Sequence, residues 1–178
     1  MKQDIKEVLI DETQIQKKNR ELGKMISEHY RGEKLTVICI LKGAIMFMSD
    51  LIKNIDIPLE IDFMDVSSYG EGTTSSGVVK IVKDLDSSIE DKNILIVEDI
   101  IDSGLTLSYL MKILKSRGPK SIEICTLLDK PTGRTIDMDV KYVGFTVPDA
   151  FLVGYGLDFA EKYRNLPYIG ILKENVYR

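Results

Sequence analysis

Short apolar runs alternate along the chain with segments whose apolar residues recur every three or four positions. Continuous apolar runs are typical of strands buried on both faces of a parallel sheet, and the three-or-four spacing is typical of helices. The runs that predict strands are 35–41, 59–66, 78–82, 93–98, 121–128, 142–147 and 169–172. The segments that predict helices begin near residues 11, 44 and 103. This alternation predicts an α/β fold with a mostly parallel, doubly wound sheet flanked by helices.

The first predicted helix has a start signal and a stop signal. Asp11 is followed three residues later by Gln14, which is the spacing of a capping box. Gly32 follows the last apolar position and is a suitable residue to end the helix. The sequence therefore predicts a helix that begins after Asp11 and ends before Gly32.

The segment 94–106, which reads ILIVEDIIDSGLT, stands out because ligands of doubly wound sheets bind beyond the carboxyl ends of the strands. Glu98, Asp99 and Asp102 come at the end of its apolar run. Three carboxylates so close together repel one another unless a cation or a polar ligand lies among them. The alternative is that Asp102 caps the next helix and that Glu98 and Asp99 are solvated.

A phosphate site is the second feature of this segment. Ser103, Gly104, Leu105 and Thr106 present backbone N–H groups where a helix begins, and such a bend binds a phosphate monoester. The carboxylates just upstream could hold sugar hydroxyls or the water shell of Mg²⁺. A phosphate cradle beside an acidic pair predicts a site for a phosphorylated ribose.

The sequence VEDIIDSGLT, residues 97–106, resembles the phosphoribosyl-pyrophosphate signature of the purine phosphoribosyltransferases. The surrounding segments, from about 8 to 172, are similar to bacterial hypoxanthine-guanine phosphoribosyltransferases. The resemblance implies a type I phosphoribosyltransferase fold in which the terminal segments form a small hood, with residues 1–178 as one domain. It also implies Mg²⁺-dependent transfer of 5-phosphoribose from phosphoribosyl pyrophosphate to N9 of hypoxanthine or guanine, with two ions during turnover.

In this family the residue that matches Asp102 is the general base for the proton at N7 of the purine, a role that contributes roughly 10²–10⁴-fold. The residues that match Glu98 and Asp99 lie over the ribose 2′- and 3′-hydroxyls, directly or through Mg²⁺. Leu105 stands where some relatives have Lys, so one possible charge contact to the phosphate is absent. The backbone donors of the bend are expected to maintain the phosphate site.

The resemblance also implies a diphosphate site. Leu41, Lys42 and Gly43 match the pyrophosphate loop of the family, in which the first peptide bond can be cis. Arg164 matches a diphosphate contact, and Asp158 matches a ligand of the second Mg²⁺ ion. On the pattern alone, residues 41–43 could be an ordinary turn between a strand and a helix. Because the chain carries a net charge of −4, the pocket for an anionic substrate must be made locally positive by Lys42, Arg164 and Mg²⁺.

The residues implied for the purine come from four places in the chain. Lys130 matches the lysine that donates to the purine O6, and Phe151 matches the ring that stacks on the purine face. Ile100 would pack on the opposite face. The backbone around Leu152 and Asp158 would contact the purine edge near its 2-position. On the pattern alone, a lone lysine is usually solvated and an isolated Phe in an apolar run is usually core.

Residues 67–77 are polar and contain three glycines, which predicts a long mobile loop at about 67–78. The resemblance implies that this loop is a lid in which Ser68 and Tyr69 close over the reacting centre. A lid of this kind would keep water from the positive charge that develops at C1′ of the ribose.

Composition excludes several other classes of protein. Apolar residues make up 44% of the chain and charged residues 29%, values that an intrinsically disordered protein does not have. The longest apolar runs, such as 37–41, have five residues, whereas a membrane-spanning helix needs about 20. The acidic balance argues against binding to nucleic acid, and the N-terminus shows no signal peptide.

The two cysteines, Cys39 and Cys125, both lie in apolar runs. This placement predicts buried free thiols in a reducing compartment, and therefore a cytoplasmic protein. The single histidine, His29, leaves little for a zinc site or a Ser-His-Asp triad. The expected partners are the small-molecule substrates and further copies of the chain, because the family commonly forms homodimers or homotetramers.

The sequence is also compatible with two alternative functions. A regulator that binds nucleic acid could keep the same fold and signature, although it would be expected to add a basic surface. A phosphoribosyltransferase for another base is the second alternative. Lys130 and Phe151 argue against adenine and the pyrimidines, whereas xanthine differs from guanine only at a position that the sequence does not read.

Overall fold

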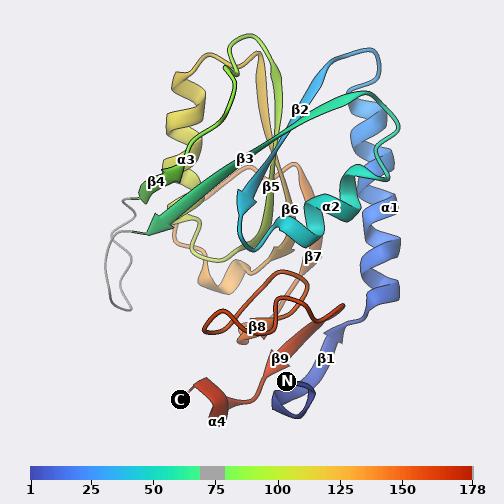
Figure 1. The fold of residues 1–178 in the computed structure, drawn as a ribbon, viewed down its shortest axis with the longest axis vertical. Helices are drawn as coiled ribbons and strands as arrows, with labels where there is room; N and C mark the ends of the chain where they lie inside the picture. The colour runs from blue at the N-terminus through green and yellow to red at the C-terminus, as the bar shows by residue number, and fades with distance from the viewer. Residues whose placement is uncertain (69–78, 178) are drawn as a thin grey trace.

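A six-stranded sheet forms the centre of the molecule in the computed structural model, which describes residues 1–68 and 79–177 (Figure 1). The strand order is β4-β3-β2-β5-β6-β7, and all neighbours are parallel except β4, which is antiparallel to β3. The strands of this sheet are β2 (Leu35–Leu41), β3 (Leu59–Ser68), β4 (Val79–Lys83), β5 (Asn93–Ile101), β6 (Ser121–Asp129) and β7 (Tyr142–Thr146). The longer helices are α1 (Glu12–His29), α2 (Ile45–Ile52) and α3 (Leu105–Ser116). The predicted mostly parallel α/β sheet is confirmed.

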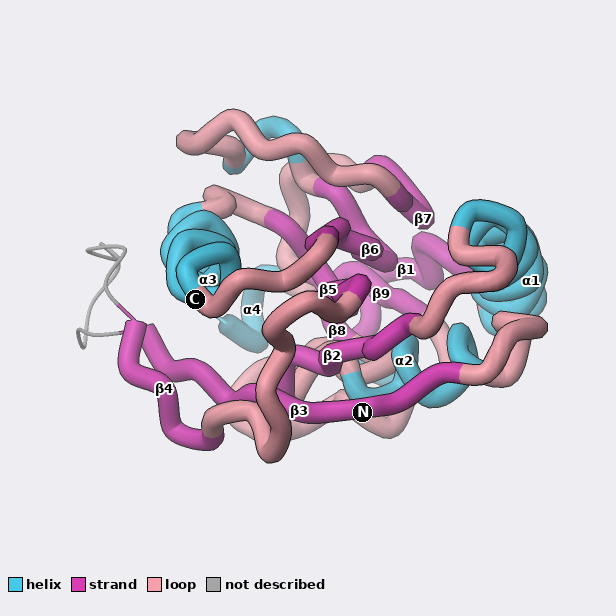
Figure 2. Tube along the Cα trace, turned by 90° about the horizontal axis from the view of Figure 1, so that it is seen from above, coloured by secondary structure: helices cyan, strands magenta, loops and turns pink. Residues whose placement is uncertain are grey.

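Helices cover both faces of the sheet, as the continuous apolar runs predicted. Along β2, Val37 and Cys39 belong to the core that packs against α1 and α2. Ile38 and Ile40, which point to the other face, belong to the core that packs against α3. Figure 2 shows α1 and α2 on one side of the strands and α3 on the other. Strands buried on both faces must be apolar at every position, which is why they read as unbroken runs.

Helix α1 starts at the predicted capping box. The Asp11 side chain accepts a hydrogen bond from the backbone N–H of Gln14 at 2.8 Å, and the Gln14 side chain accepts one from the backbone N–H of Asp11 at 2.9 Å. At the other end the helix stops at His29, and Gly32 adopts a φ of +79°. Both boundary predictions are confirmed.

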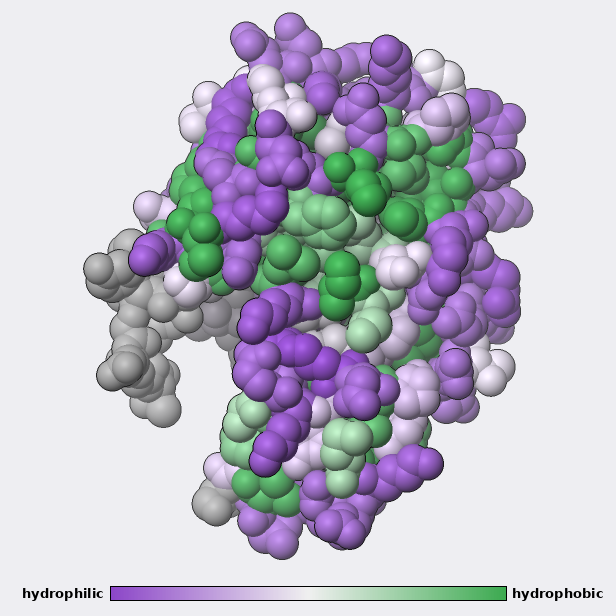
Figure 3. All heavy atoms as spheres, viewed as in Figure 1, coloured by the Kyte–Doolittle hydropathy of each residue, from purple (hydrophilic) through white to green (hydrophobic). Residues whose placement is uncertain are grey.

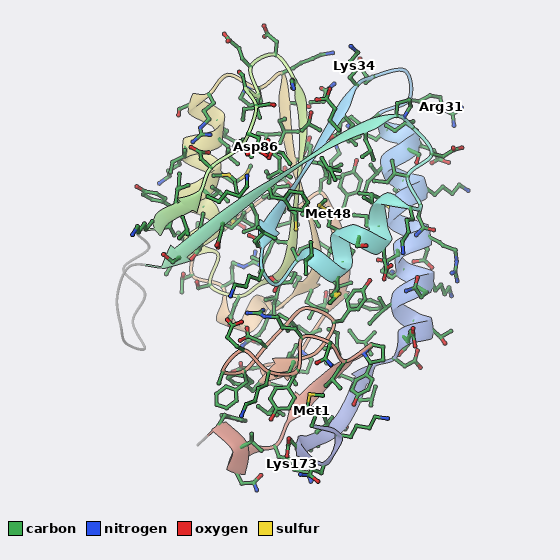
Figure 4. All side chains as sticks on the ribbon, in the orientation of Figure 1. Met1, Arg31, Lys34, Met48, Asp86 and Lys173 are labelled. Atoms are coloured by element: carbon green, nitrogen blue, oxygen red, sulfur yellow. The ribbon has the colours of Figure 1, made fainter. Side chains whose placement is uncertain are left out.

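A second, smaller sheet forms the hood. It has the order β1-β9-β8, and its strands are β1 (Ile5–Ile10), β8 (Leu152–Val153) and β9 (Ile169–Leu172). The two ends of the chain meet there: Lys173 donates its backbone N–H to the Asp4 carbonyl at 2.9 Å, and Figure 4 shows Met1 and Lys173 together at this end. The short elements are two 3₁₀ turns, Lys2–Asp4 and Pro131–Gly133, and α4 (Glu174–Tyr177). The expected hood built from the terminal segments is confirmed.

The hood strands β1 and β8 were not predicted from the sequence. In β1 only Ile10 is buried, and Lys6 and Glu7 interrupt the apolar positions. Strand β8 has two residues, too few to show a period. Both strands form because β9 supplies the partner for their backbone hydrogen bonds, a long-range pairing that no local pattern encodes.

The boundaries of several central elements differ from the prediction. Ser67 and Ser68 belong to β3 and not to the following loop, because they pair with β4. Strand β5 continues to Ile101, so Asp99 and Ile100 lie within it. Tyr69 and the rest of 69–78, which were predicted to form the lid, lie outside the described residues.

The outer face of β3 is only partly covered. Leu59, Ile61 and Phe63 share one side of this strand, as predicted, but Ile61 is 48% exposed, and Met46 on α2 is 39% exposed. Figure 3 shows apolar side chains at the surface over these two elements. Alternation alone therefore identified the face but not how far it is buried.

Both cysteines are buried free thiols, as predicted: Cys39 and Cys125 belong to the core under α1 and α2. Burial raises the pKa of the Cys39 thiol to about 12, so this thiol stays protonated. Within the described residues, no helix combines the length and the apolar character needed to cross a membrane.

Helix α1 approaches the chain just after α2 so closely at Gly23 that a side chain there would collide with the backbone. A Cβ atom on Gly23 would lie 2.4 Å from the Asn54 carbonyl oxygen. Alanine favours a helix over glycine by about 1 kcal/mol, but overpacking a core typically costs about 1–3 kcal/mol. We expect Gly23→Ala to lower the midpoint of urea unfolding. Lys24→Ala on the exposed side of the same helix is the matched control, and an increase for Gly23→Ala would contradict the packing described here.

Candidate active site

The carboxyl ends of β2, β5 and β6 lie side by side, because these strands are neighbours in the sheet. This edge brings together residues 41–43, 98–106 and 130, which are far apart in the sequence. A cavity of about 270 Å³ opens there and is lined by Ile40, Leu41, Val66, Glu98, Ile100, Ile101, Asp102, Ser103, Gly104, Thr106 and Leu107. The sequence-predicted phosphate bend therefore shares one cavity with two of the three predicted acidic residues, Glu98 and Asp102.

The bend 103–106 has the geometry of a helix N-terminus preceded by a tight turn. Gly104 is the N-cap of α3 and has a φ of +80°, a conformation that other residues rarely adopt. The Ser103 hydroxyl accepts a hydrogen bond from the backbone N–H of Leu105 at 3.3 Å. The Ser103 carbonyl accepts from the backbone N–H of Thr135 at 3.0 Å, so the loop after β6 fixes the bend from outside. The first N–H groups of α3 point toward the place where an anion would bind.

Asp102 does not cap α3, so the capping alternative for this residue is wrong. The helix begins at Leu105, two residues later than a cap at Asp102 requires, because Gly104 makes the turn. The Asp102 carboxylate instead forms an ion pair with Lys130 at 3.0 Å and is half exposed. A Cβ atom on Gly133 would lie 1.6 Å from Asp102 Oδ1, so the carboxylate packs directly on the backbone there.

The carboxyl groups of Glu98 and Asp99 lie in an environment that opposes their ionisation. Glu98 is 9% exposed, and burial together with the neighbouring Asp99 raises the pKa of its carboxyl group well above the ordinary value. Burial also raises the pKa of Asp99 to about 6, although the backbone N–H of Ile100, 2.7 Å from Asp99 Oδ1, acts in the opposite direction. A cation bound beside this pair would stabilise the charged forms.

The three candidate metal ligands do not form one ready-made cage. Among the described residues, no three His, Cys, Asp or Glu side chains converge on a point that could hold a metal ion. Glu98 and Asp99 are consecutive, whereas Asp158 comes from the hood and pairs with Arg164 at 2.9 Å. This donor set fits Mg²⁺, which is usually held by one or two carboxylates together with water and phosphate oxygens of a substrate.

The loop 41–43 is clamped between the central strand and the hood. The peptide bond between Leu41 and Lys42 is cis, as the resemblance allowed. A Cβ atom on Gly43 would lie 1.7 Å from Asp99 Oδ2, and a Cβ atom on Gly156 would lie 1.9 Å from the Gly43 carbonyl oxygen. Both positions therefore require glycine, since any side chain would push the loop away from its neighbours.

Arg164 and Lys42 both pair with the carboxylate of Glu161. Lys42 Nζ lies 3.3 Å from a carboxylate oxygen of Glu161, and Arg164 Nη2 lies 3.2 Å from the other oxygen of the same carboxylate. Arg164 also donates to the Gly156 carbonyl at 2.8 Å. Its Nε atom is buried and has no hydrogen-bond partner among the described residues. Two cationic side chains with spare donors suit a diphosphate.

The loop that carries Asp158 and Arg164 has an unusual backbone. Ala160, Glu161 and Tyr163 have φ values of 51°, 60° and 77°, in the left-handed region that non-glycine residues rarely occupy. Conformations of this kind cluster at ligand sites, where the surrounding structure holds them in place. Glu161, which had no motif to mark it, is the residue that links Lys42 to Arg164.

Lys130 lies beside Asp102 on the other flank of the cavity. Its ammonium group forms ion pairs with Asp102 and with Asp149, each at 3.0 Å. Burial alone would lower the pKa of Lys130, but the hydrogen bonds to these two carboxylates raise it above the ordinary value. Arg134, which sequence reasoning missed, donates to the Asp102 carbonyl at 3.1 Å and pairs with Asp129. A lone arginine in a loop gives no signal of such a role.

The predicted purine-stacking ring, Phe151, is 36% exposed and belongs to an aromatic cluster. Tyr177 stacks on it with ring centroids 4.7 Å apart, and Phe159 meets it edge-on at 5.5 Å. Neither partner was identified from the sequence, because both are isolated aromatic residues. Leu152 is buried in β8, and Ile100 lines the cavity.

A larger cavity, of about 540 Å³, lies at the amino ends of the same strands. Lys34 lines it, and Figure 4 shows that Lys34 lies at the end of the molecule opposite Met1 and Lys173 in the hood. Two further lysines of this cavity are already paired with glutamates, Lys92 with Glu60 at 3.0 Å and Lys120 with Glu33 at 2.9 Å. None of the residues predicted for the site lines it, so we place the candidate active site in the smaller cavity.

The chain is similar to known phosphoribosyltransferases. Residues 8–160 match the family model described as the phosphoribosyl transferase domain. The hypoxanthine-guanine phosphoribosyltransferase of Bacillus subtilis (strain 168) is 63% identical over 99% of this chain and 98% of its own length.

Solved structures show the same relationship. A hypoxanthine phosphoribosyltransferase from Staphylococcus aureus superposes with a TM-score of 0.97 at 57% identity and covers 100% of this chain and 97% of its own. A hypoxanthine-guanine phosphoribosyltransferase from Bacillus anthracis has a TM-score of 0.91 at 50% identity, over 95% of this chain and 99% of its own. The chain therefore belongs to the phosphoribosyltransferase family and, within it, to the hypoxanthine-guanine phosphoribosyltransferases.

Proposed function

We propose that this protein is a purine-salvage enzyme that transfers 5-phosphoribose from phosphoribosyl pyrophosphate to N9 of hypoxanthine or guanine, giving IMP or GMP and pyrophosphate. One observation carries the proposal: the phosphate bend 103–106, the Asp102–Lys130 pair and the 41–43 loop, whose Lys42 pairs with Glu161 beside Arg164, all follow the carboxyl ends of neighbouring strands. The substrate's monoester, reacting base and diphosphate would each find a matching region there.

The phosphoribose end binds at the bend. The N–H groups at the start of α3 donate to the 5′-phosphate, and Gly104 allows the turn that aims them at it. Glu98 and Asp99 face the ribose hydroxyls, directly or through metal. No charged side chain of the bend itself meets the phosphate, since Leu105 is apolar, so the backbone supplies this contact.

Mg²⁺ is the metal we propose, held by Glu98 and Asp99 at one position and by Asp158 at another. Bound there, it would supply positive charge to the ribose and diphosphate oxygens of the substrate. The raised pKa values of Glu98 and Asp99 support this assignment, because a cation offsets the cost of keeping both carboxylates charged in a buried site. Lys42 and Arg164 bind the leaving diphosphate, and the Arg164 fork can meet two of its oxygens.

The purine lies against Phe151, with Ile100 on its opposite face. Lys130 donates to O6 of the ring, which selects 6-oxopurines over 6-aminopurines, and Asp102 holds the proton at N7. The two roles are linked, since the ion pair with Lys130 fixes the Asp102 carboxylate. The backbone near Leu152 and Asp158 meets the purine edge.

The remaining expectations belong to the same proposal. The whole chain works as one domain in the cytoplasm, as a homodimer or homotetramer, with substrates as its other partners. The lid role of Ser68 and Tyr69 belongs to the proposal through the family resemblance, because Tyr69 lies outside the described residues.

The activity itself can be tested by spectrophotometry. With phosphoribosyl pyrophosphate and Mg²⁺, we expect turnover of hypoxanthine and guanine, and we expect EDTA to abolish it because the diphosphate charge is then uncompensated. Xanthine and adenine serve as comparison substrates. Retained turnover in EDTA would exclude the metal assignment, and binding of RNA without any transfer would favour the regulator instead.

Asp102→Asn tests the general base. The variant keeps the shape of the side chain but cannot take the N7 proton, so we expect kcat to fall by roughly 10²–10⁴-fold while the binding of phosphoribosyl pyrophosphate stays nearly unchanged. Asp149→Asn is the matched control, since it also removes an ion pair of Lys130 but lies further toward solvent. Wild-type turnover in Asp102→Asn would refute the role.

Asp99→Asn tests the electrostatic cost of the site in the ligand-free protein. Folding raises the pKa of Asp99 from 3.8 to about 6, so the fold favours the protonated form. The stability this gives is complete below about pH 4 and is lost as the pH rises through about 6. Asparagine cannot ionise, so we expect the variant to unfold at a higher temperature than wild type above pH 6 and at a similar temperature near pH 4. If the unfolding temperatures of the two proteins differed by the same amount at every pH, the raised pKa of Asp99 would be contradicted.

A further inference from the structure

The hydroxyl group of Tyr155 joins the hood to the two helices on one face of the sheet. It donates a hydrogen bond to Asp50 Oδ2 on α2 at 2.7 Å and accepts one from Asn19 Nδ2 on α1 at 3.1 Å. Asp50 is fixed in turn by Gln16 at 3.2 Å and by Lys53 at 2.6 Å. Figure 1 shows the hood loops around β8 next to α2. None of these five residues has a role in the proposed function.

Tyr155 and Asn19 are buried in this contact, Asp50 is partly buried, and the tyrosine hydroxyl keeps its proton. Tyr155 is 6% exposed, and Asn19 is fully buried. Burial, followed by the hydrogen bond to Asp50, raises the pKa of the Tyr155 hydroxyl far above its ordinary value, so the group donates at any physiological pH. A buried donor and acceptor that satisfy each other fix a geometry, because losing either partner leaves the other unsatisfied.

The backbone of Tyr155 explains why such a contact is useful. Tyr155 has a φ of 47° and lies between Gly154 and Gly156, which have φ values of 100° and 103°. Three consecutive residues in the left-handed region form a turn that a tyrosine does not favour by itself. The side-chain hydrogen bonds therefore supply stabilisation that this backbone lacks.

This turn sets the position of the diphosphate residues. Gly156 presses on the Gly43 carbonyl with no room for a Cβ atom, and its own carbonyl accepts from Arg164 at 2.8 Å. The backbone N–H of Gly156 also donates to the Arg164 carbonyl at 2.9 Å. A shift of the turn would move Arg164 and release the 41–43 loop together.

Helix α2 connects the 41–43 loop with Asp50, the hydrogen-bond partner of Tyr155. It begins two residues after Gly43, and Asp50 lies in its last turn. The loop is therefore attached to the start of α2, while the hood turn is held near its end through Tyr155.

We propose that Tyr155, held by Asp50, is a positioning residue for the diphosphate end of the substrate; this inference rests on the function proposed above. It acts through the turn 154–157 and does not touch the substrate. Two of the residues proposed for the purine, Lys130 and Asp102, follow β6 and β5 and belong to the central sheet edge. Phe151 and Leu152 precede the turn in the hood, where Leu152 is held in β8 by its pairing with β9.

Steady-state kinetics of Tyr155→Phe provide the test. We expect KM for phosphoribosyl pyrophosphate to rise about tenfold, since small misplacements at a site can cost up to about a hundredfold, while KM for hypoxanthine stays within about twofold. If Tyr155 had a purely structural role, the substitution would lower the unfolding temperature without changing the two KM values differently.

Further variants serve as controls for this test. Tyr142→Phe is the matched control, because Tyr142 is also buried but its hydroxyl has no partner among the described residues; both KM values should stay at wild type. Asp50→Leu removes the acceptor of the Tyr155 hydroxyl and should raise KM for phosphoribosyl pyrophosphate. Asp50→Asn keeps an acceptor, so most of this rise should be absent in it. The double variant Tyr155→Phe/Asp50→Leu should be no worse than either single one, because both remove the same hydrogen bond.

Amide hydrogen exchange in the ligand-free protein separates this proposal from the enzymatic one. In Tyr155→Phe we expect faster exchange at 154–157 and at 41–43, whatever the catalytic activity. An inactive wild-type protein would overturn the proposed function. An active wild type with unchanged exchange, or with an equal rise of both KM values in Tyr155→Phe, would overturn the role of Tyr155.

Discussion

The placement of two adjacent carboxyl groups, one buried and one partly buried, at the end of the central strand is the constraint on which the rest of the site depends. Strand β5 carries Glu98 and Asp99 out of an apolar core, and their raised pKa values reflect the cost of that placement. A core built only for stability would place apolar residues there. The protein keeps the carboxyl groups and arranges a helix N-terminus and two cationic side chains around them, which is the pattern expected where charge is reserved for a ligand.

Glycines allow the parts of the site to meet without side chains between them. Gly43 lets the 41–43 loop touch Asp99, Gly133 lets the loop after β6 touch Asp102, and Gly156 lets the hood touch Gly43. At each contact a backbone lies directly against a functional group or against another backbone. Such contacts leave little freedom, so the distances between the three regions of the site are set by the fold and not by flexible side chains.

The hood completes the site from the two ends of the chain. Strand β1 supplies an edge for β9, β9 pairs with β8, and the loops between them carry Asp158, Glu161 and Arg164 over the sheet. Several residues of these loops have left-handed backbone conformations, and Tyr155, which is one of them, reaches Asp50 on α2 through its side chain. The region that we propose for the diphosphate is therefore the part of the site most dependent on long-range contacts.

The sequence by itself determined the central sheet, the helix signals and the phosphate bend, because these rest on local pattern. Strands buried on both faces must be apolar throughout, capping is decided within four residues, and a glycine turn into a helix is contiguous. Only the tertiary structure decided that Asp102 pairs with Lys130, that Glu161 links Lys42 to Arg164, and that Tyr155 reaches Asp50. These contacts join residues whose positions depend on strand order and on the hood, and isolated charged or aromatic residues carry no local mark of the partner that folding brings to them.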